Sequence, residues 1–327
     1  MIIVSTGCPA GVGPEVSVAA AARLPERCLL VGDHGTLIAA AESVGVDPRR
    51  LVPFTRGARK RHDIPVFHMG PVLSAADRRP GRPSKKSGVA QLAYIDVAYD
   101  LVRAGVGRAL VTAPVSKEVI AASGAPGAAR FRGHTEHLKD RDGAEHAVMC
   151  FASRSLVTSL VTTHLALTRV PRAVSKKSVA AAIRALAALL QGLGRKRTDI
   201  AVCSLNPHAG EGEMFGNEER SAIVPGMAEA RRSLGARVRL TGPIGAETAF
   251  RKAKLGDFDG VVAMYHDQAT IPLKLVAFGE AVNVTMGLSL VRTSVDHGTA
   301  YDIAWRGRAD PAGMLAAMRL AKRLAAG

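Results

Sequence analysis

Three histidines each follow a predicted β-strand, and imidazole is a common ligand of catalytic metal ions. His164 ends the run LVTSLVTTH, His208 follows AVCSLNP and His266 follows GVVAMY. Ligands of open α/β sheets bind beyond the carboxyl ends of the strands, so we expect these side chains at one edge. Three imidazoles on one divalent cation would leave positions for a substrate, and Asp267 could orient His266 or act as an acid or base. The alternative is that each histidine is an ordinary loop residue, because their spacing matches no local zinc signature.

Five further polar residues stand near the same predicted edges. They come from the run GHTEH and from an otherwise apolar region near the end of the chain, and they are His134, Thr135, Lys274, Asn283 and Arg292. A cation in an apolar region needs a partner, because unpaired buried charge is costly. A phosphate or carboxylate group of the substrate would supply this partner. Arg292 could bind it through two parallel N–H donors, and Lys274 through the charge of its ammonium group. The alternative is that both cations lie on solvated turns.

The elements that must position these residues alternate in type along the chain. Apolar, β-branched runs are separated by alanine-rich stretches, which predicts an α/β protein with largely parallel sheets. We expect strands at 1–5, 28–31, 109–112, 156–163, 200–205, 260–265 and 281–285. We expect helices at 89–103 and at 178–191, the second with Gly192 as its C-cap. The segment DRRPGRPSKKS at 77–87 is polar and rich in proline and basic residues, so we expect an exposed loop.

Composition limits the class of protein. A chain of 327 residues is long enough for one large or two medium domains. It has no apolar run of membrane-span length and no visible secretory signal, and its four cysteines lack a CxxC pair. We therefore expect a cytoplasmic protein with reduced thiols.

The formal net charge of +16 allows an acidic partner, either a metabolite or a nucleic acid. Basic residues are spread along the whole chain, with only short clusters such as those at 59–61 and 195–197. Aromatic residues make up 4% of the chain, which provides few platforms for base stacking. A solvated basic surface is the preferred interpretation, and a non-catalytic nucleic-acid-binding protein remains the alternative.

The N-terminal run STGCPAGVGPE joins a predicted strand to an alanine-rich helix, as phosphate-binding loops do. Its glycines are spaced G-x3-G-x-G, which matches neither the dinucleotide nor the P-loop fingerprint. Pro9 and Pro14 also remove two amide donors that a phosphate cradle would use. We therefore interpret the run as a tight turn at the edge of a cleft.

Seven stretches, in order over nearly the whole chain, carry a family resemblance. They are PAGVGPE (9–15), TAPVSKEVI (112–120), GHTEHL (133–138), TTHLAL (162–167), LNPHAGEGEMFGNEE (205–219), GPIGAETAF (242–250) and the run at 263–300 that contains YHDQ and RTSVDHGTA. Together they resemble the 4-hydroxythreonine-4-phosphate dehydrogenase (PdxA) family, NAD-dependent enzymes of pyridoxal 5'-phosphate biosynthesis.

The resemblance implies a three-layer α/β/α fold like that of isocitrate and isopropylmalate dehydrogenases, with two domains flanking a cleft. The first domain would comprise 1–128 plus 277–327. The second, at 129–276, would carry the metal-binding histidines and the contacts of a homodimer. The active site would be shared between the two subunits.

The resemblance also assigns roles to residues. It places a divalent metal on His164, His208 and His266, and substrate contacts at His134, Thr135, Lys274, Asn283 and Arg292. The segment 296–310 is similar to the HGxAxDIAGKG stretch of isopropylmalate dehydrogenases. It therefore implies NAD or NADP near His297, Gly298, Thr299, Ala300 and Asp302.

The reaction implied is oxidation and decarboxylation of 4-phosphohydroxy-L-threonine to 3-amino-2-oxopropyl phosphate. Lys274 would neutralise an anionic group, and Asp267 and His134 are the candidates for the base that takes the hydroxyl proton. Zinc suits three imidazoles best, while magnesium, manganese or cobalt can substitute with other geometry.

Four residues depart from the family pattern. Cys8 replaces a carboxylate, Glu247 stands where Asp is common, Arg132 precedes GHTE, and Trp305 replaces a glycine. These departures keep open a paralogue that oxidises D-threonate or D-erythronate 4-phosphate, or an aromatic cis-dihydrodiol carboxylate.

Overall fold

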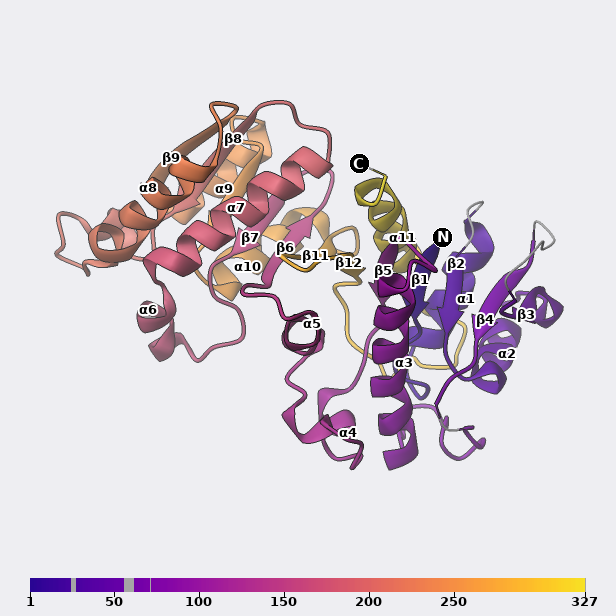
Figure 1. Ribbon diagram of the computed structural model, residues 1–327. Coiled ribbons are helices and arrows are strands. Elements are labelled where there is room, and N and C mark those ends of the chain that lie inside the picture. Colours follow the sequence, from indigo (N-terminus) through magenta and orange to yellow (C-terminus); the bar gives the residue numbers. More distant parts are fainter. Residues whose placement is uncertain (25–27, 56–61, 71, 327) are drawn as a thin grey trace. The chain divides into compact units, whose positions relative to one another are not determined.

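The computed structural model describes residues 1–24, 28–55, 62–70 and 72–326, and the basic cluster at 59–61 lies outside them. The chain forms two compact units (Figure 1). The first unit comprises Met1–Ala144 and Leu288–Ala326, and the second comprises Glu145–Gly287. No helix among the described residues is long and apolar enough to cross a membrane.

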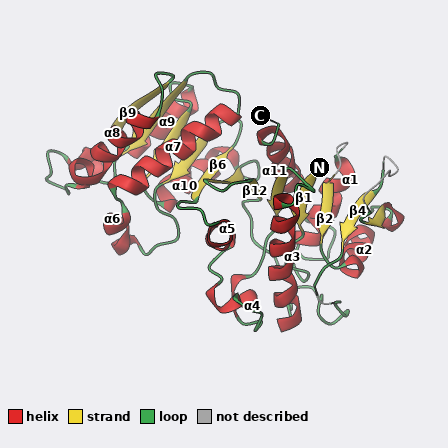
Figure 2. Cartoon of the chain, viewed as in Figure 1, coloured by secondary structure: helices red, strands yellow, loops and turns green. Residues whose placement is uncertain are grey.

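The sheet of the first unit is parallel throughout and has the order β3-β4-β2-β1-β5-β12. Its strands are β1 (Ile2–Ser5), β2 (Cys28–Val31), β3 (Leu51–Pro53), β4 (Ile64–Phe67), β5 (Ala109–Thr112) and β12 (Val291–Ser294). The helix α3 packs on one face, whereas α1, α2 and α11 cover the other (Figure 2). The helices of the first unit are α1 (Gly13–Arg23), α2 (His34–Ser43), α3 (Lys85–Arg103), α4 (Lys117–Ala121), α5 (His134–Asp142) and α11 (Ala312–Leu324).

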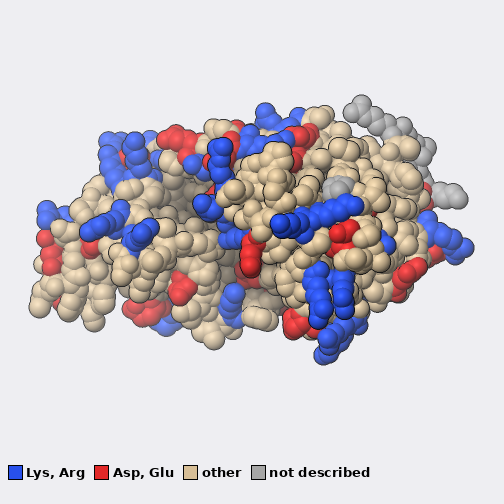
Figure 3. Space-filling model, turned by 90° about the horizontal axis from the view of Figure 1, so that it is seen from below, with Lys and Arg blue, Asp and Glu red and all other residues tan. Residues whose placement is uncertain are grey.

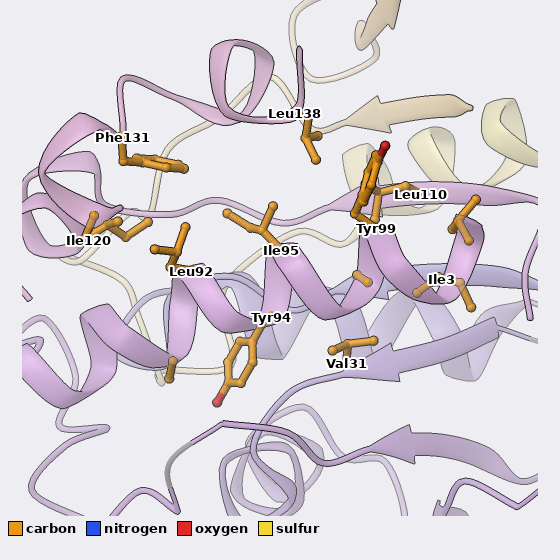
Figure 4. Close-up of a cluster of buried hydrophobic side chains, with 14 of the residues drawn as sticks. Ile3, Val31, Leu92, Tyr94, Ile95, Tyr99, Leu110, Ile120, Phe131 and Leu138 are labelled. Atoms are coloured by element: carbon orange, nitrogen blue, oxygen red, sulfur yellow. The ribbon is translucent and has the colours of Figure 1, made fainter. Parts of the chain in front are cut away.

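The face of this sheet beneath α3 holds the main hydrophobic cluster of the unit (Figure 4). Ile3, Val31 and Leu110 of the strands belong to this cluster together with Ile95 of α3, and all four side chains are fully buried. Burial of a side chain of this size stabilises a fold by about 1.5–3 kcal/mol. The cluster therefore fixes the strand ends from which the loops of the unit emerge.

The sheet of the second unit has the order β11-β6-β7-β10-β8-β9, in which β6 runs antiparallel to both of its neighbours. The strands are β6 (Val148–Ala152), β7 (Val157–Leu160), β8 (Thr198–Cys203), β9 (Val238–Ile244), β10 (Gly260–Ala263) and β11 (Val282–Met286). The helices are α6 (Val170–Ala173), α7 (Lys176–Gly192), α8 (Val224–Ser233), α9 (Ala246–Leu255) and α10 (His266–Ala277). The helices α9 and α10 pack on one face and α7 on the other, so each unit has the predicted three-layer α/β/α build.

Several predicted bounds need correction. The predicted loop at 77–87 ends early, because Ser84 caps α3 by accepting a hydrogen bond from the Ser87 amide, and the helix begins at Lys85. Gly192 is the last residue of α7 rather than its cap, and the left-handed residue that follows is Gly194. The strands β3, β4, β6, β9 and β12 were absent from the predicted set.

The division between the units also differs from the predicted bounds of 128/129 and 276/277. The chain crosses at 144/145 and at 287/288. The helix α5 belongs to the first unit because Leu138 is fully buried in its core and the Tyr99 hydroxyl donates to Asp142 at 2.7 Å. The strand β11 belongs to the second unit because it pairs with β6.

Candidate active site

The three histidines follow three neighbouring strands of the second unit. The strands β7, β10 and β8 are parallel and adjacent, so their carboxyl ends share one edge of the sheet. His164 comes after β7 and His208 after β8, whereas His266 is the first residue of α10, directly after β10. The expected placement at strand ends is therefore present in the structure.

Two of these imidazoles lie together. The ring centroids of His164 and His266 are 5.5 Å apart. Two imidazoles on one zinc ion place their centroids about 5 Å apart, since the zinc–nitrogen distance is about 2 Å and the geometry is tetrahedral. His266 Nδ1 lies 2.7 Å from Asp267 Oδ1, an arrangement that leaves Nε2 for an ion. The donor set of this pair thus fits a divalent metal.

The third histidine sits apart from that pair in this chain. His208 lies in a loop with left-handed backbone (φ 52°), its side chain is 73% exposed, and its Nδ1 is 3.7 Å from Glu211. The described residues contain no group of three or more His, Cys, Asp or Glu side chains placed to hold one ion. The three-histidine site therefore stays a prediction, and the structure brings two of the three predicted ligands together.

Three other residues singled out in the second unit lie on α10, β11 and α9. Lys274 is exposed on α10, about two turns after His266. Asn283 lies on β11, and its Oδ1 is buried without a hydrogen-bond partner among the described residues. Glu247 stands in the first turn of α9, where its Oε1 accepts from the Thr248 hydroxyl at 3.0 Å.

The remaining substrate candidates form a cationic cluster in the first unit. His134 and Thr135 begin α5 after Gly133, whose φ of 154° lies in the region that glycine adopts. Arg292 lies on β12, is 2% exposed, and donates from Nη2 to the Thr112 hydroxyl at 2.6 Å. A helix N-terminus and a buried guanidinium favour an anion, and the Glu136 carboxylate is the nearby negative charge that raises the pKa of Arg292.

Burial sets the protonation of this cluster. Desolvation and, next, the nearby positive charge of Arg292 hold the pKa of His134 well below its usual range, so its imidazole is neutral at pH 7. Its Nε2 is buried and lacks a hydrogen-bond partner among the described residues. Burial also lowers the pKa of Arg292 to about 10, which still leaves it charged.

Sequence reasoning missed Lys117 as a member of this cluster. It begins α4, and its Nζ lies 3.4 Å from the position that a side-chain Cβ would take at Gly133. Its charge also contributes to the lowered pKa of His134. The only signal was its place in the motif TAPVSKEVI, which by itself does not reveal a neighbour in α5.

The expected cofactor segment follows β12 and has no regular secondary structure up to Ala300. His297, Gly298 and Asp302 are exposed, and Ala300 has a left-handed backbone (φ 44°). Exposed loop residues at the carboxyl end of a parallel strand are where open α/β sheets bind ligands.

Three of the four departures from the family pattern lie in the first unit. Cys8 is buried, its Sγ is 3.4 Å from the Tyr301 hydroxyl, and desolvation raises its pKa. Trp305 has a φ of 61°, which suits the glycine that the family carries there. Arg132 is exposed and donates a long hydrogen bond, 3.4 Å, to the Ala129 carbonyl.

One face of the molecule carries mixed charge. On the face drawn in Figure 3, Lys and Arg side chains of the described residues are interspersed with Asp and Glu. Such mixing is typical of a solvated basic surface. All four cysteines are buried and free.

Two α/β units, one with paired imidazoles at the carboxyl edge of its strands and one with the buried Arg292–His134 cluster, define the class of the protein as an α/β enzyme. Comparison with known proteins gives the family. The chain belongs to the PdxA family, described as pyridoxal phosphate biosynthetic protein PdxA, whose model matches residues 25–321.

Three relatives illustrate the likeness. A 4-hydroxythreonine-4-phosphate dehydrogenase of Desulfosudis oleivorans is 42% identical over 98% of this chain and 95% of its own. The crystal structure of 4-hydroxythreonine-4-phosphate dehydrogenase from Klebsiella pneumoniae is 33% identical, covers 99% of both chains and has a TM-score of 0.82. A terephthalate 1,2-cis-dihydrodiol dehydrogenase from Burkholderia xenovorans is 29% identical over 98% of this chain and 97% of its own, with a TM-score of 0.69.

Proposed function

We propose that the protein oxidises and decarboxylates 4-phosphohydroxy-L-threonine to 3-amino-2-oxopropyl phosphate, using a divalent metal and NAD or NADP. The observation that carries this proposal is the His164–His266 pair at the carboxyl edge of the second unit's strands, in a PdxA family chain. The products besides the aminoketone phosphate are CO2 and the reduced nicotinamide.

The metal would be held by His164, His266 and His208. The first two already have the spacing of shared ligands, and His208 emerges from the strand beside β10. Asp267 would orient His266 through Nδ1. When bound, the cation would stabilise negative charge on substrate oxygen during oxidation and loss of CO2. Zinc is the preferred ion for such a ligand set.

The anionic end of the substrate would bind to the cluster of the first unit. Arg292 and Lys117 supply positive charge, and the α5 N-terminus with Thr135 supplies hydrogen-bond donors. Lys274 would neutralise a second anionic group, and the buried, unpartnered Oδ1 of Asn283 would accept a hydrogen bond from the substrate.

The two candidates for the base differ in their partners. Asp267 Oδ1 already accepts from His266, whereas neutral His134 has a buried Nε2 without a partner among the described residues. We therefore assign a substrate contact to His134 and the orientation of His266 to Asp267, and both remain candidates for the base. The residues His297–Asp302 would hold the nicotinamide dinucleotide, which supplies a hydride acceptor when bound.

A homodimer completes the proposal. Ile271 and Leu275 form an exposed apolar stripe on α10, with 60% and 80% of their surface exposed, and Phe278, which is 82% exposed, directly follows the end of the helix. Lys274 falls on the same stripe, because residues three and four apart share a helix face. Burial of this stripe against a second copy would bring Lys274 to the subunit boundary, as a shared active site requires.

A substrate panel tests the assignment. Metal-loaded protein with NAD or NADP should reduce nicotinamide with 4-phosphohydroxy-L-threonine at a higher kcat/KM than with D-threonate 4-phosphate, D-erythronate 4-phosphate or an aromatic cis-dihydrodiol carboxylate. A higher kcat/KM for one of the other three compounds would replace the substrate while keeping the chemistry. Salt-sensitive binding to random duplex DNA, without bound metal or turnover, would favour the nucleic-acid-binding alternative.

A further inference from the structure

The N-terminal loop at 8–15 lies against the segment at 299–307, which includes expected cofactor residues. The Val12 amide donates to the Thr299 carbonyl at 3.0 Å. A Cβ added at Gly11 would stand 2.7 Å from that same carbonyl oxygen, so a glycine is required for the approach. The indole Nε1 of Trp305 donates to the Pro9 carbonyl at 3.1 Å.

Glu15 makes the strongest of these contacts. It is fully buried in the first turn of α1, and its two carboxylate oxygens accept from two amides of the segment. Oε2 accepts from the Trp305 amide at 2.7 Å, and Oε1 accepts from the Gly307 amide at 3.1 Å. A buried carboxylate is costly unless it is hydrogen-bonded, and bonds to a charged group are stronger than neutral ones. Both oxygens of Glu15 are thus committed to holding the segment.

The segment needs such a restraint because its backbone is strained. Trp305 and Ala300 have φ values of 61° and 44°, and a left-handed conformation costs a residue with a side chain about 1–2 kcal/mol. Strain of this kind persists where the surroundings determine the conformation, and it concentrates at ligand sites. The Trp305 amide that Glu15 holds belongs to one of the two strained residues.

We infer that Glu15 is a positioning residue for the nicotinamide dinucleotide, because it fixes the conformation of the segment 299–307. This inference rests on the proposed function, which places the dinucleotide on that segment. The inference also explains the run PAGVGPE, whose residues hydrogen-bond to the segment 299–307 and do not themselves bind a phosphate.

The test is Glu15→Gln, since an amide keeps the shape but presents an NH2 group to one of the two amide donors. Trp305 is the only tryptophan of the chain, so its emission reports on the segment, and energy transfer from it measures NADH binding. We expect the Kd for NADH to rise about tenfold or more. The Trp305 emission maximum should shift without ligand, while the KM of the phosphorylated substrate and the metal content stay near wild type.

Exposed Glu42 of the same unit supplies the matched control, and Glu42→Gln should leave all four readouts unchanged. If Glu15→Gln does not fold, the same measurements are made on Gly11→Ala, because the added Cβ would displace the segment at Thr299 and should raise the Kd for NADH in the same way. Gly235→Ala, which adds a Cβ with nothing within 4 Å, is its control.

The outcomes separate the two proposals. Wild-type protein that binds neither NADH nor NADPH overturns the proposed function. Wild-type protein that binds NADH, with a folded Glu15→Gln variant of equal Kd, overturns the positioning role alone. A variant in which the Kd for NADH and the KM of the substrate rise equally also overturns it, because that result indicates a general loss of structure.

Discussion

Arg292→Met separates the binding of an anion from the stability of the fold. Burial lowers the pKa of Arg292 from 12.5 to about 10, which corresponds to about 3 kcal/mol at roughly 1.4 kcal/mol per pKa unit. Methionine is an uncharged side chain of comparable length, so the substitution removes the free-energy cost of burying a charge. It also removes the hydrogen bond to the Thr112 hydroxyl, worth about 1 kcal/mol. The net effect should be a stabilisation of about 2 kcal/mol in the absence of ligand.

The same substitution should weaken anion binding. Loss of one partner of a buried charge pair costs about 2–5 kcal/mol, so the Kd of inorganic phosphate should rise about 30-fold or more. We expect the Tm of the free protein to rise by about 4 °C, since 1 kcal/mol shifts Tm by about 2–4 °C in units of this size. Added phosphate should then raise the Tm of wild type but not that of the variant.

The assay is a thermal-shift titration with phosphate, checked by calorimetry. Arg108→Met is the matched control, because Arg108 is an exposed cation of the same unit, and its phosphate response should equal that of wild type. Equal stabilisation of wild type and Arg292→Met by phosphate would refute the anion site. A lower Tm for Arg292→Met would refute the estimate of the burial cost.

Three further predictions follow from the same geometry. Acid should destabilise wild type more than His134→Gln, because the depressed pKa of His134 lets the unfolded chain bind a proton that the folded chain does not. The free energy of unfolding should fall as the pH drops below about 6.5, by at most about 1.4 kcal/mol per pH unit. Equal changes of Tm between pH 7 and pH 5.5 in the two proteins would contradict this. Asp267→Asn should lower zinc affinity about 10–100-fold in equilibrium dialysis, and an unchanged affinity would remove Asp267 from its orienting role. Leu275→Asp together with Phe278→Asp should shift the protein from dimer to monomer in analytical ultracentrifugation, and a dimer that persists would place the interface elsewhere.

The strands that carry the histidines could be predicted because they lie in runs rich in β-branched, apolar and small residues. β10 reads GVVA and β8 ends in IAVC, while β7 reads VTSL within the longer run LVTSLVTT. By contrast, β12 reads VRTS and contains the buried Arg292, and β9 contains Pro243 near its end. Polar and proline residues indicate loops when only local sequence is considered.

Contacts between distant parts of the chain could not be predicted in the same way. The spacing of glycines in the run at 8–15 correctly indicated a turn, but its partner lies near Trp305, at the other end of the sequence. Lys117 and His134 likewise approach only because α4 and α5 belong to the same unit. The sheet order that brings such segments together is set by tertiary packing, which local patterns do not encode.

The proposed reaction is tested by nicotinamide reduction with 4-phosphohydroxy-L-threonine, before and after removal of metal. We expect turnover by zinc-loaded protein, loss of turnover after complete chelation, and recovery when zinc is restored. His266→Ala should show neither turnover nor stoichiometric zinc. Turnover that persists in the metal-free protein and in His266→Ala would exclude a metal-dependent reaction.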